Sequence, residues 1–299
     1  MSAESNPWPE LDWSAWERTA STLHMWTQIV GKVRLALSPM QAHWWNVALY
    51  VSARGLSTSA MPTAGEMLDI EFDFVSHELH FRLSTGATLS IPLRAQTVAD
   101  FYLEFQQCLT LLGVDARIHP MPVEIKDPIR FDLDTKHASY DPEYAHRFWR
   151  VLVNVDQIFQ KFSSAFTGKI SPVHFFWGSF DLAVTRFSGK RAPERPGADA
   201  VTREAYSDEV ISAGFWPGNG GYGEAAFYCY AAPSPDDLVN AKVEPAAAYF
   251  DTKMGEFLLR YNDARKQASP EKTVRTFLES TYAAAADKAG WDRAALERH

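Results

Sequence analysis

The second half of the chain repeats the plan of the first half, with matching residues in the same order. The clearest matches lie 133 residues apart: Trp16 with Trp149, Ser38-Pro39 with Ser171-Pro172, and Trp44 with Trp177. The order continues at wider spacing in Gly86 with Gly255 and Thr97 with Thr273. Such a pattern predicts an internal duplication, which would decide the whole fold. Duplicated folds often place a ligand pocket between the copies.

The spacing of the matches divides the 299 residues into two units. Residues 1–118 form the first unit, 119–142 a Pro-rich connector, and 143–299 the second unit. The second unit is longer, and we place the extra residues in an insertion near 188–223, which is rich in Gly, Pro and charge. Long loops inside compact folds are typically functional, so we expect this one to close over a pocket.

Each unit is expected to open with an amphipathic helix. Ser14 and Glu17 form a capping-box signal for the first helix, and Asp141-Pro142 begins the second. The helices that close the units are expected to begin at Thr97 and Ser269.

Strands are expected between these helices. The runs 43–54 and 173–187 are rich in aromatic and β-branched residues and predict one long strand each, and alternation over 68–75 and 79–83 predicts a hairpin. The predicted fold class is therefore α+β, with two pseudo-repeated units of helix, mostly antiparallel strands and helix packed as one pseudo-symmetric body.

Composition limits the partners of the protein. A formal net charge of −8 and scattered basic residues argue against nucleic acid, and no apolar run is long enough for a membrane span. The polar N-terminus and two isolated cysteines favour a cytoplasmic protein with reduced thiols. The oligomeric state does not follow from the sequence.

No sequence motif identifies a cofactor or a metal. Residues 218–223 match the G-x-G-x-x-G pattern, but they follow Trp216-Pro217 and lead into a strand-like run rather than a helix. His77 and His80 would point to opposite faces of a strand, and no zinc-type spacing is present. The sequence therefore predicts no metal and no cofactor.

Comparison of the two units points to Asp181 as the main candidate for catalysis. It occupies a strand position where the first unit has Ala48, and a carboxylate there must be paired or face a polar cleft. His174 and Glu209 are the other catalytic candidates, as acid or base. The candidate ligand-binding residues are Trp44, Asn46, Arg54, Trp177, Ser179, Arg186 and Tyr206. A structural ion pair or backbone cap at Asp181 is the alternative interpretation.

Four segments resemble a bacterial family of about 300 residues that carries a domain-of-unknown-function label. They are 43–46, 136–142, the run SPVHFFWGSFDLAVTRFSG at 171–189, and GFWPG at 214–218. The resemblance covers nearly the whole chain and implies no activity.

The leading hypothesis is a cytoplasmic protein that binds a small molecule in a cleft between the two units, with acid-base residues that would serve an enzyme. The alternative is an interaction or structural protein without catalysis, in which the 10 Trp and 19 Phe serve both the core and a partner surface. Whether the protein is an enzyme stays open at this point.

Overall fold

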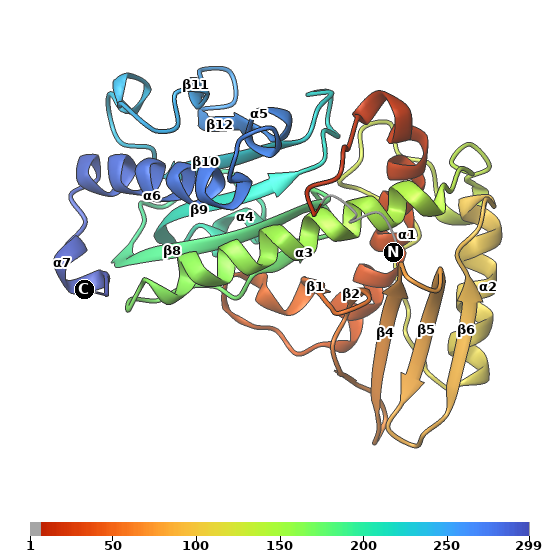
Figure 1. Ribbon diagram of the computed structural model, residues 1–299. Coiled ribbons are helices and arrows are strands. Elements are labelled where there is room, and N and C mark those ends of the chain that lie inside the picture. Colours follow the sequence, from red (N-terminus) through yellow and green to blue (C-terminus); the bar gives the residue numbers. More distant parts are fainter. Residues whose placement is uncertain (1–6, 299) are drawn as a thin grey trace.

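The computed structural model describes residues 7–298 and contains two antiparallel sheets with helices packed against them (Figure 1). The predicted α+β class is confirmed. Both halves run in the expected order of helix, sheet and helix. The internal duplication itself remains a prediction. The matched residues Gly86 and Gly255 do occupy similar places: each has a positive φ and lies in the turn between two consecutive strands.

The first half is built around helix α1 (Trp13–Leu37), which is buried along most of its length. Its sheet has the order β1-β2-β4-β5-β6, with β3 added to β4. The strands are β1 (Tyr50–Val51), β2 (Gly55–Ser57), β3 (Met61–Pro62), β4 (Met67–Asp73), β5 (Glu78–Leu83) and β6 (Thr88–Pro92). The β4–β5 pair confirms the predicted hairpin.

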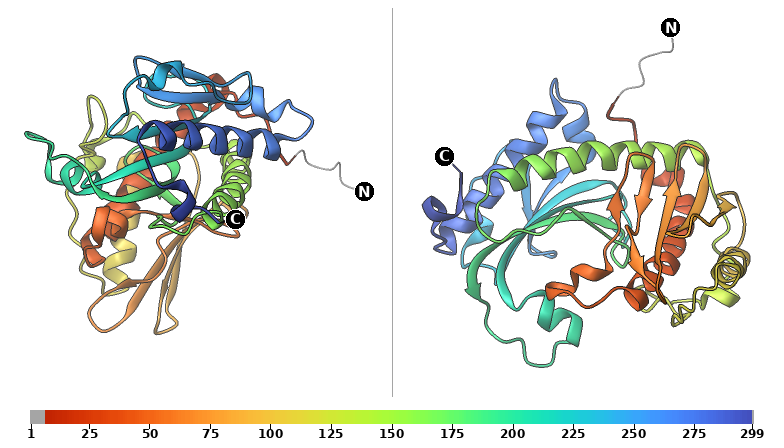
Figure 2. Two further views of the ribbon diagram at one scale, coloured as in Figure 1. Left: turned by 90° about the vertical axis from the view of Figure 1, so that its left-hand side faces the viewer. Right: turned by 90° about the horizontal axis from the view of Figure 1, so that it is seen from below.

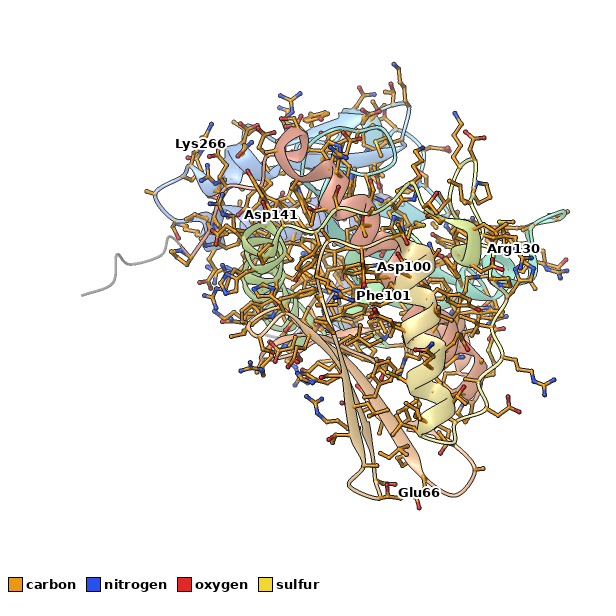
Figure 3. The ribbon with its side chains drawn as sticks, turned by 90° about the vertical axis from the view of Figure 1, so that its right-hand side faces the viewer. Glu66, Asp100, Phe101, Arg130, Asp141 and Lys266 are labelled. Carbon is orange, nitrogen blue, oxygen red and sulfur yellow. The ribbon has the colours of Figure 1, made fainter. Side chains whose placement is uncertain are left out.

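Helix α2 (Val98–Leu111) begins at the predicted cap, because the Thr97 side chain accepts a hydrogen bond from the Asp100 backbone. Figure 3 shows α2 beside the strands, with Asp100 and Phe101 near one of its ends and Glu66 at the tip of the sheet. Trp26 stacks on Phe101 with ring centroids 4.6 Å apart, which fixes α1 against α2. A 3-10 helix, η2 (Phe131–Leu133), packs on α2.

The second half has a sheet of order β11-β12-β10-β9-β8-β7. Its strands are β7 (His174–Phe176), β8 (Asp181–Arg191), β9 (Asp208–Trp216), β10 (Ala226–Ala232), β11 (Tyr249–Asp251) and β12 (Glu256–Arg260). Its helices are α3 (Pro142–Ser164), α4 (Ala200–Ala205), η3 (Leu238–Asn240), α5 (Tyr261–Arg265), α6 (Pro270–Lys288) and α7 (Arg293–Leu296). The predicted starts of α3 and α6 are confirmed.

Helices α3 and α6 cover one face of the second sheet. On that face the Arg186 guanidinium lies over the Phe162 and Tyr282 rings, 3.5 Å and 4.2 Å from their centroids. Figure 2 shows the 3-10 helix η1 (Ala42–Val47) and α4 on the other side of the curved sheet from α3. The space between the sheet and these two short helices is where the candidate site lies.

The two halves share backbone and core contacts. Leu49 and Phe175 exchange both backbone hydrogen bonds, at 2.9 Å and 2.8 Å, so the loop after η1 is paired with β7. Buried side chains of both halves form one continuous hydrophobic cluster. No helix within residues 7–298 is both long and apolar enough to cross a membrane.

The predicted long strand over 43–54 is wrong. This stretch forms η1 and the short strand β1, because His43 and Trp44 adopt left-handed backbone angles with φ of 59° and 61°. A strand cannot continue through such residues. Contacts with distant residues hold this shape, since the His43 ring donates to backbone carbonyls of α4.

Three other local predictions also differ from the structure. The run 173–187 is a hairpin rather than one strand, since Phe180 in its turn has φ of 61°. Trp177, in the same turn, packs against Gly31 of α1 and donates to the Val47 carbonyl. The insertion predicted near 188–223 is not one long loop, because it contains α4 and the central strand β9. Asp12 rather than Ser14 caps α1, because the Asp12 side chain accepts from the Ser14 backbone.

Candidate functional site

A cavity of about 540 Å³ lies on the face of the second sheet that α3 and α6 leave uncovered. Alternate residues of the strands form its floor: Asp181, Ala183 and Thr185 on β8, Ser212 on β9, Tyr228 on β10 and Glu256 on β12. Its walls come from η1, α4 and the loop that follows β9. One wall therefore belongs to the first half of the chain and the floor to the second.

Strand alternation explains which residues reach the cavity. Successive side chains of a strand point to opposite faces, so Asp181 and Ala183 face the cavity while Leu182 and Val184 face the helices. The same rule places Tyr228 in the cavity and Cys229 in the core. The two thiols, Cys108 and Cys229, are both free.

Asp181 is the most unusual group in the cavity. Asp181 is only 7% exposed, and the Tyr228 hydroxyl donates a hydrogen bond to the Asp181 Oδ2. Its Oδ1 has no hydrogen-bond partner among residues 7–298. Burial raises the pKa of Asp181 to about 6, although the Tyr228 hydrogen bond acts in the opposite direction. A buried carboxylate oxygen without a donor is costly and requires an explanation.

Glu256 is a second carboxyl group in the same cavity. Burial raises its pKa to about 7, and the neighbouring carboxylates Asp181 and Asp251 add to the shift. Both acids can therefore gain or lose a proton near neutral pH.

The remaining polar groups of the cavity are mostly paired hydroxyls. Thr185 and Ser212 lie 2.9 Å apart between their oxygens, as do Tyr206 and Tyr230. The Asn219 side-chain amide nitrogen donates to the Ser179 carbonyl at 2.8 Å. The Asn219 Oδ1 has no partner among residues 7–298.

Aromatic rings make up much of the wall. The lining rings are those of Trp44, Trp45, Phe176, Phe187, Trp216 and the tyrosines 206, 228 and 230. Trp216 packs against Tyr228 with ring centroids 5.2 Å apart. The Trp44 Nε1 hydrogen has no acceptor among residues 7–298. The cavity is therefore a mostly aromatic space with a few unsatisfied polar atoms, as is typical of ligand sites.

A polar cluster behind the wall holds η1 in place. The His43 Nδ1 lies 3.1 Å from the Glu204 carbonyl, and the Lys169 Nζ lies 2.5 Å from His43 Nε2. Asp208 pairs with Lys169 at 2.9 Å and with Arg191 at 2.7 Å. These bonds tie η1 to α4 and, through Lys169, to the start of β9, and so fix one wall against the floor.

Four of the residues predicted from the sequence line the cavity: Asp181, Trp44, Ser179 and Tyr206. His174 lies behind Trp45, with ring centroids 5.9 Å apart, and is fully enclosed. Burial lowers its pKa to about 4, with a smaller effect from the Arg34 charge. Neither His174 nitrogen has a partner among residues 7–298.

The other predicted residues lie elsewhere. Arg54 pairs with Asp73 in the first sheet, and Glu209 accepts from the Ser188 hydroxyl at 2.8 Å outside the cavity. Asn46 accepts a bond from the Gln41 backbone. Trp177 donates to the Val47 carbonyl at 2.8 Å and lies against Gly31 of α1, and Arg186 is on the helix-covered face.

Sequence reasoning missed Glu256, Tyr228 and Trp216. Alternation along 226–232 would have placed Tyr228 and Tyr230 on one face, but it could not say which face. Glu256 gives no local signal, because its importance comes from Asp181, which is distant in the sequence. No group of three or more His, Cys, Asp or Glu residues within 7–298 is placed to hold a metal ion.

Residues 8–298 match the model of a protein family described as a family of unknown function (DUF5996). No curated protein and no solved structure matches the chain.

Proposed function

Because the chain belongs to this family of unknown function, we propose its role from its own cavity: it is a cytoplasmic protein that binds a small organic molecule against the second sheet. The observation that carries the proposal is the buried Asp181 with one carboxylate oxygen unsatisfied in a cavity of about 540 Å³. A ligand that donates a hydrogen bond there would remove the cost of this unpaired group. The two free cysteines support a reducing compartment.

Asp181 is suited to bind a ligand rather than to stabilise the fold. A structural role would leave both oxygens bonded, whereas here the Tyr228 hydroxyl serves only Oδ2. A near-isosteric amide at this position can keep the Tyr228 bond through its oxygen, but it removes the charge and replaces the free acceptor Oδ1 with an NH2 donor.

The test is a ligand-observed NMR screen of a broad fragment library against three proteins: the wild type, Asp181→Asn and Ala205→Trp. Ala205 lies on α4 at the cavity wall, so a larger side chain there fills the cavity with little effect on the core. We expect hits on the wild type that are lost in Ala205→Trp and weakened in Asp181→Asn. Hits that bind the wild type and Ala205→Trp equally would contradict the proposal.

Acid-base catalysis is a second candidate, supported by the two carboxyl groups whose pKa values lie near neutrality. Each bound fragment can be incubated with the protein and followed for chemical change. If a fragment is turned over, Asp181→Asn and Glu256→Gln should each lower kcat by about 100-fold or more, because a general acid or base contributes that much. Turnover that both variants retain would exclude these residues as the acid-base pair.

A further inference from the structure

The charge of the cavity suggests which class of molecule it binds. Among the described residues that line it, two are acidic, Asp181 and Glu256, one is a histidine, His43, and none is Lys or Arg. The His43 nitrogens are already engaged with the Glu204 carbonyl and with Lys169. Lys169 contacts the wall rings Trp45 and Phe187 from behind, but its charge is paired with Asp208. The interior of the cavity is therefore negative, without a balancing cation of its own.

Most of the unsatisfied atoms give the same answer. Asp181 Oδ1 and Asn219 Oδ1 are hydrogen-bond acceptors that lack a donor among residues 7–298, and Trp44 Nε1 is the one donor of the lining that lacks an acceptor among those residues. A protonated amine has donors and no acceptor, so it fits both atoms. A carboxylate or phosphate ligand would be repelled by the Asp181 carboxylate, which has no hydrogen to donate to it.

The aromatic walls add a third, independent argument. The faces of Trp and Tyr rings carry partial negative charge and attract organic cations, most strongly when the pair is shielded from water. Trp44 and Trp45 on one side and Trp216 and Tyr228 on the other supply such rings within the cavity.

We propose that the cavity binds an organic ammonium ion, with the charged nitrogen at Asp181 and the carbon skeleton against the aromatic walls. This inference rests on the proposed function and narrows it to one class of ligand. The amine nitrogen supplies the missing donor at Asp181 Oδ1, and its single positive charge offsets one of the two carboxylate charges.

Binding should then depend on pH in a defined direction. Asp181 is surrounded by Tyr228 and Tyr230 of β10 and by Glu256 of β12, which in turn faces Asp251 of β11. His43 of η1 and Tyr206, which is bonded to Tyr230, line the same cavity from its walls. The tyrosines remain neutral, because burial raises the pKa of Tyr228 and Tyr230 well above the ordinary value. The cation prefers the ionised carboxylates, so its affinity rises with pH until Asp181 and Glu256 have lost their protons.

The experiment uses isothermal titration calorimetry of the full chain with three probes of similar size and different charge: 2-phenylethylamine, 2-phenylethanol and phenylacetate. At pH 8 we expect the amine to bind at least about tenfold more tightly than the alcohol, and phenylacetate not to bind, because one unit charge is worth more than 1.4 kcal/mol at a buried site. Between pH 5 and pH 6 the amine affinity should rise by about fivefold, because the ionised fraction of a carboxyl group with a pKa of about 6 rises from about 0.1 to about 0.5 over this range.

Two variants separate charge from shape. Asp181→Asn should reduce the amine affinity to that of the alcohol, whereas Glu209→Gln, which removes one charge on β9 outside the cavity, should have little effect. Alcohol binding that equals amine binding and is blocked by Ala205→Trp would overturn the cation assignment and leave the proposed function intact. Failure of all three probes to bind would also reject the assignment, and the fragment screen then decides the proposed function separately.

Discussion

At the scale of single residues, the main feature is a carboxyl group whose charge the fold does not balance. Asp181 is buried beside Tyr228, and the next acid, Glu256, raises rather than lowers the cost of ionisation. In the protein without ligand, ionising Asp181 therefore reduces the stability of the folded state. This reduction is absent at low pH and develops as pH rises between the unfolded and folded pKa values of the group.

Asp181→Asn should therefore stabilise the unliganded protein at pH 7.5. A shift from a reference pKa of about 3.9 to about 6 corresponds to roughly 3 kcal/mol of lost stability at neutral pH. Near pH 4 the group is protonated in the folded protein, and the difference between variant and wild type should become small. Thermal unfolding followed by circular dichroism at both pH values measures this difference. Equal melting temperatures of the variant and the wild type at pH 7.5 would show that ionisation of Asp181 does not lower the stability of the folded protein.

At the scale of elements, the four long helices α1, α2, α3 and α6 followed from the sequence, and the cavity wall, which includes α4, did not. The starts of α2, α3 and α6 depend on local caps and periodicity, which the sequence displays directly. The shape of η1 depends on hydrogen bonds from His43 to α4, 161 residues away, and no local pattern reports them. Asp181 was predicted because it is unusual within its own strand, whereas Glu256 becomes important only once β12 and β8 face one cavity.

The start of α1 provides a test at this scale. Asp12→Ala should destabilise the protein by about 1 kcal/mol, because the Asp12 carboxylate accepts the hydrogen bond of an unpaired backbone N–H at the helix start. Ser14→Ala is the matched control and should cost only a few tenths of that, since the Ser14 hydroxyl donates to Asp12 in an exposed position. Urea unfolding followed by circular dichroism measures both; a larger loss for Ser14→Ala would restore the capping box expected from the sequence.

At the scale of the whole molecule, the two halves form one body with a shared core. The Leu49–Phe175 backbone pair connects them, and Phe175 lies against Phe148 of α3 and Phe180 of the β7–β8 turn. The cavity crosses the same boundary, because η1 supplies a wall and the second sheet supplies the floor. The site therefore exists only when both halves are folded together.

Phe175→Ala should destabilise both halves together, by about 3 to 5 kcal/mol, because it leaves a space in a fully buried position of the shared core. Native-state hydrogen exchange is the measurement. The slowest amides of α2 in the first half and of α6 in the second should lose the same free energy of protection. Protection of α2 that stays unchanged while α6 is affected would show that the halves unfold independently.

The aromatic walls have a practical consequence: the cavity contains its own optical reporter. Three of the 10 tryptophans, Trp44, Trp45 and Trp216, line the space in which we place the ligand. An occupant will change the polarity around these indoles, and with it the wavelength and intensity of the light they emit. Binding of any compound can therefore be followed by intrinsic fluorescence without attaching a label, and Trp45→Phe identifies how much of the signal comes from that one indole of the η1 wall.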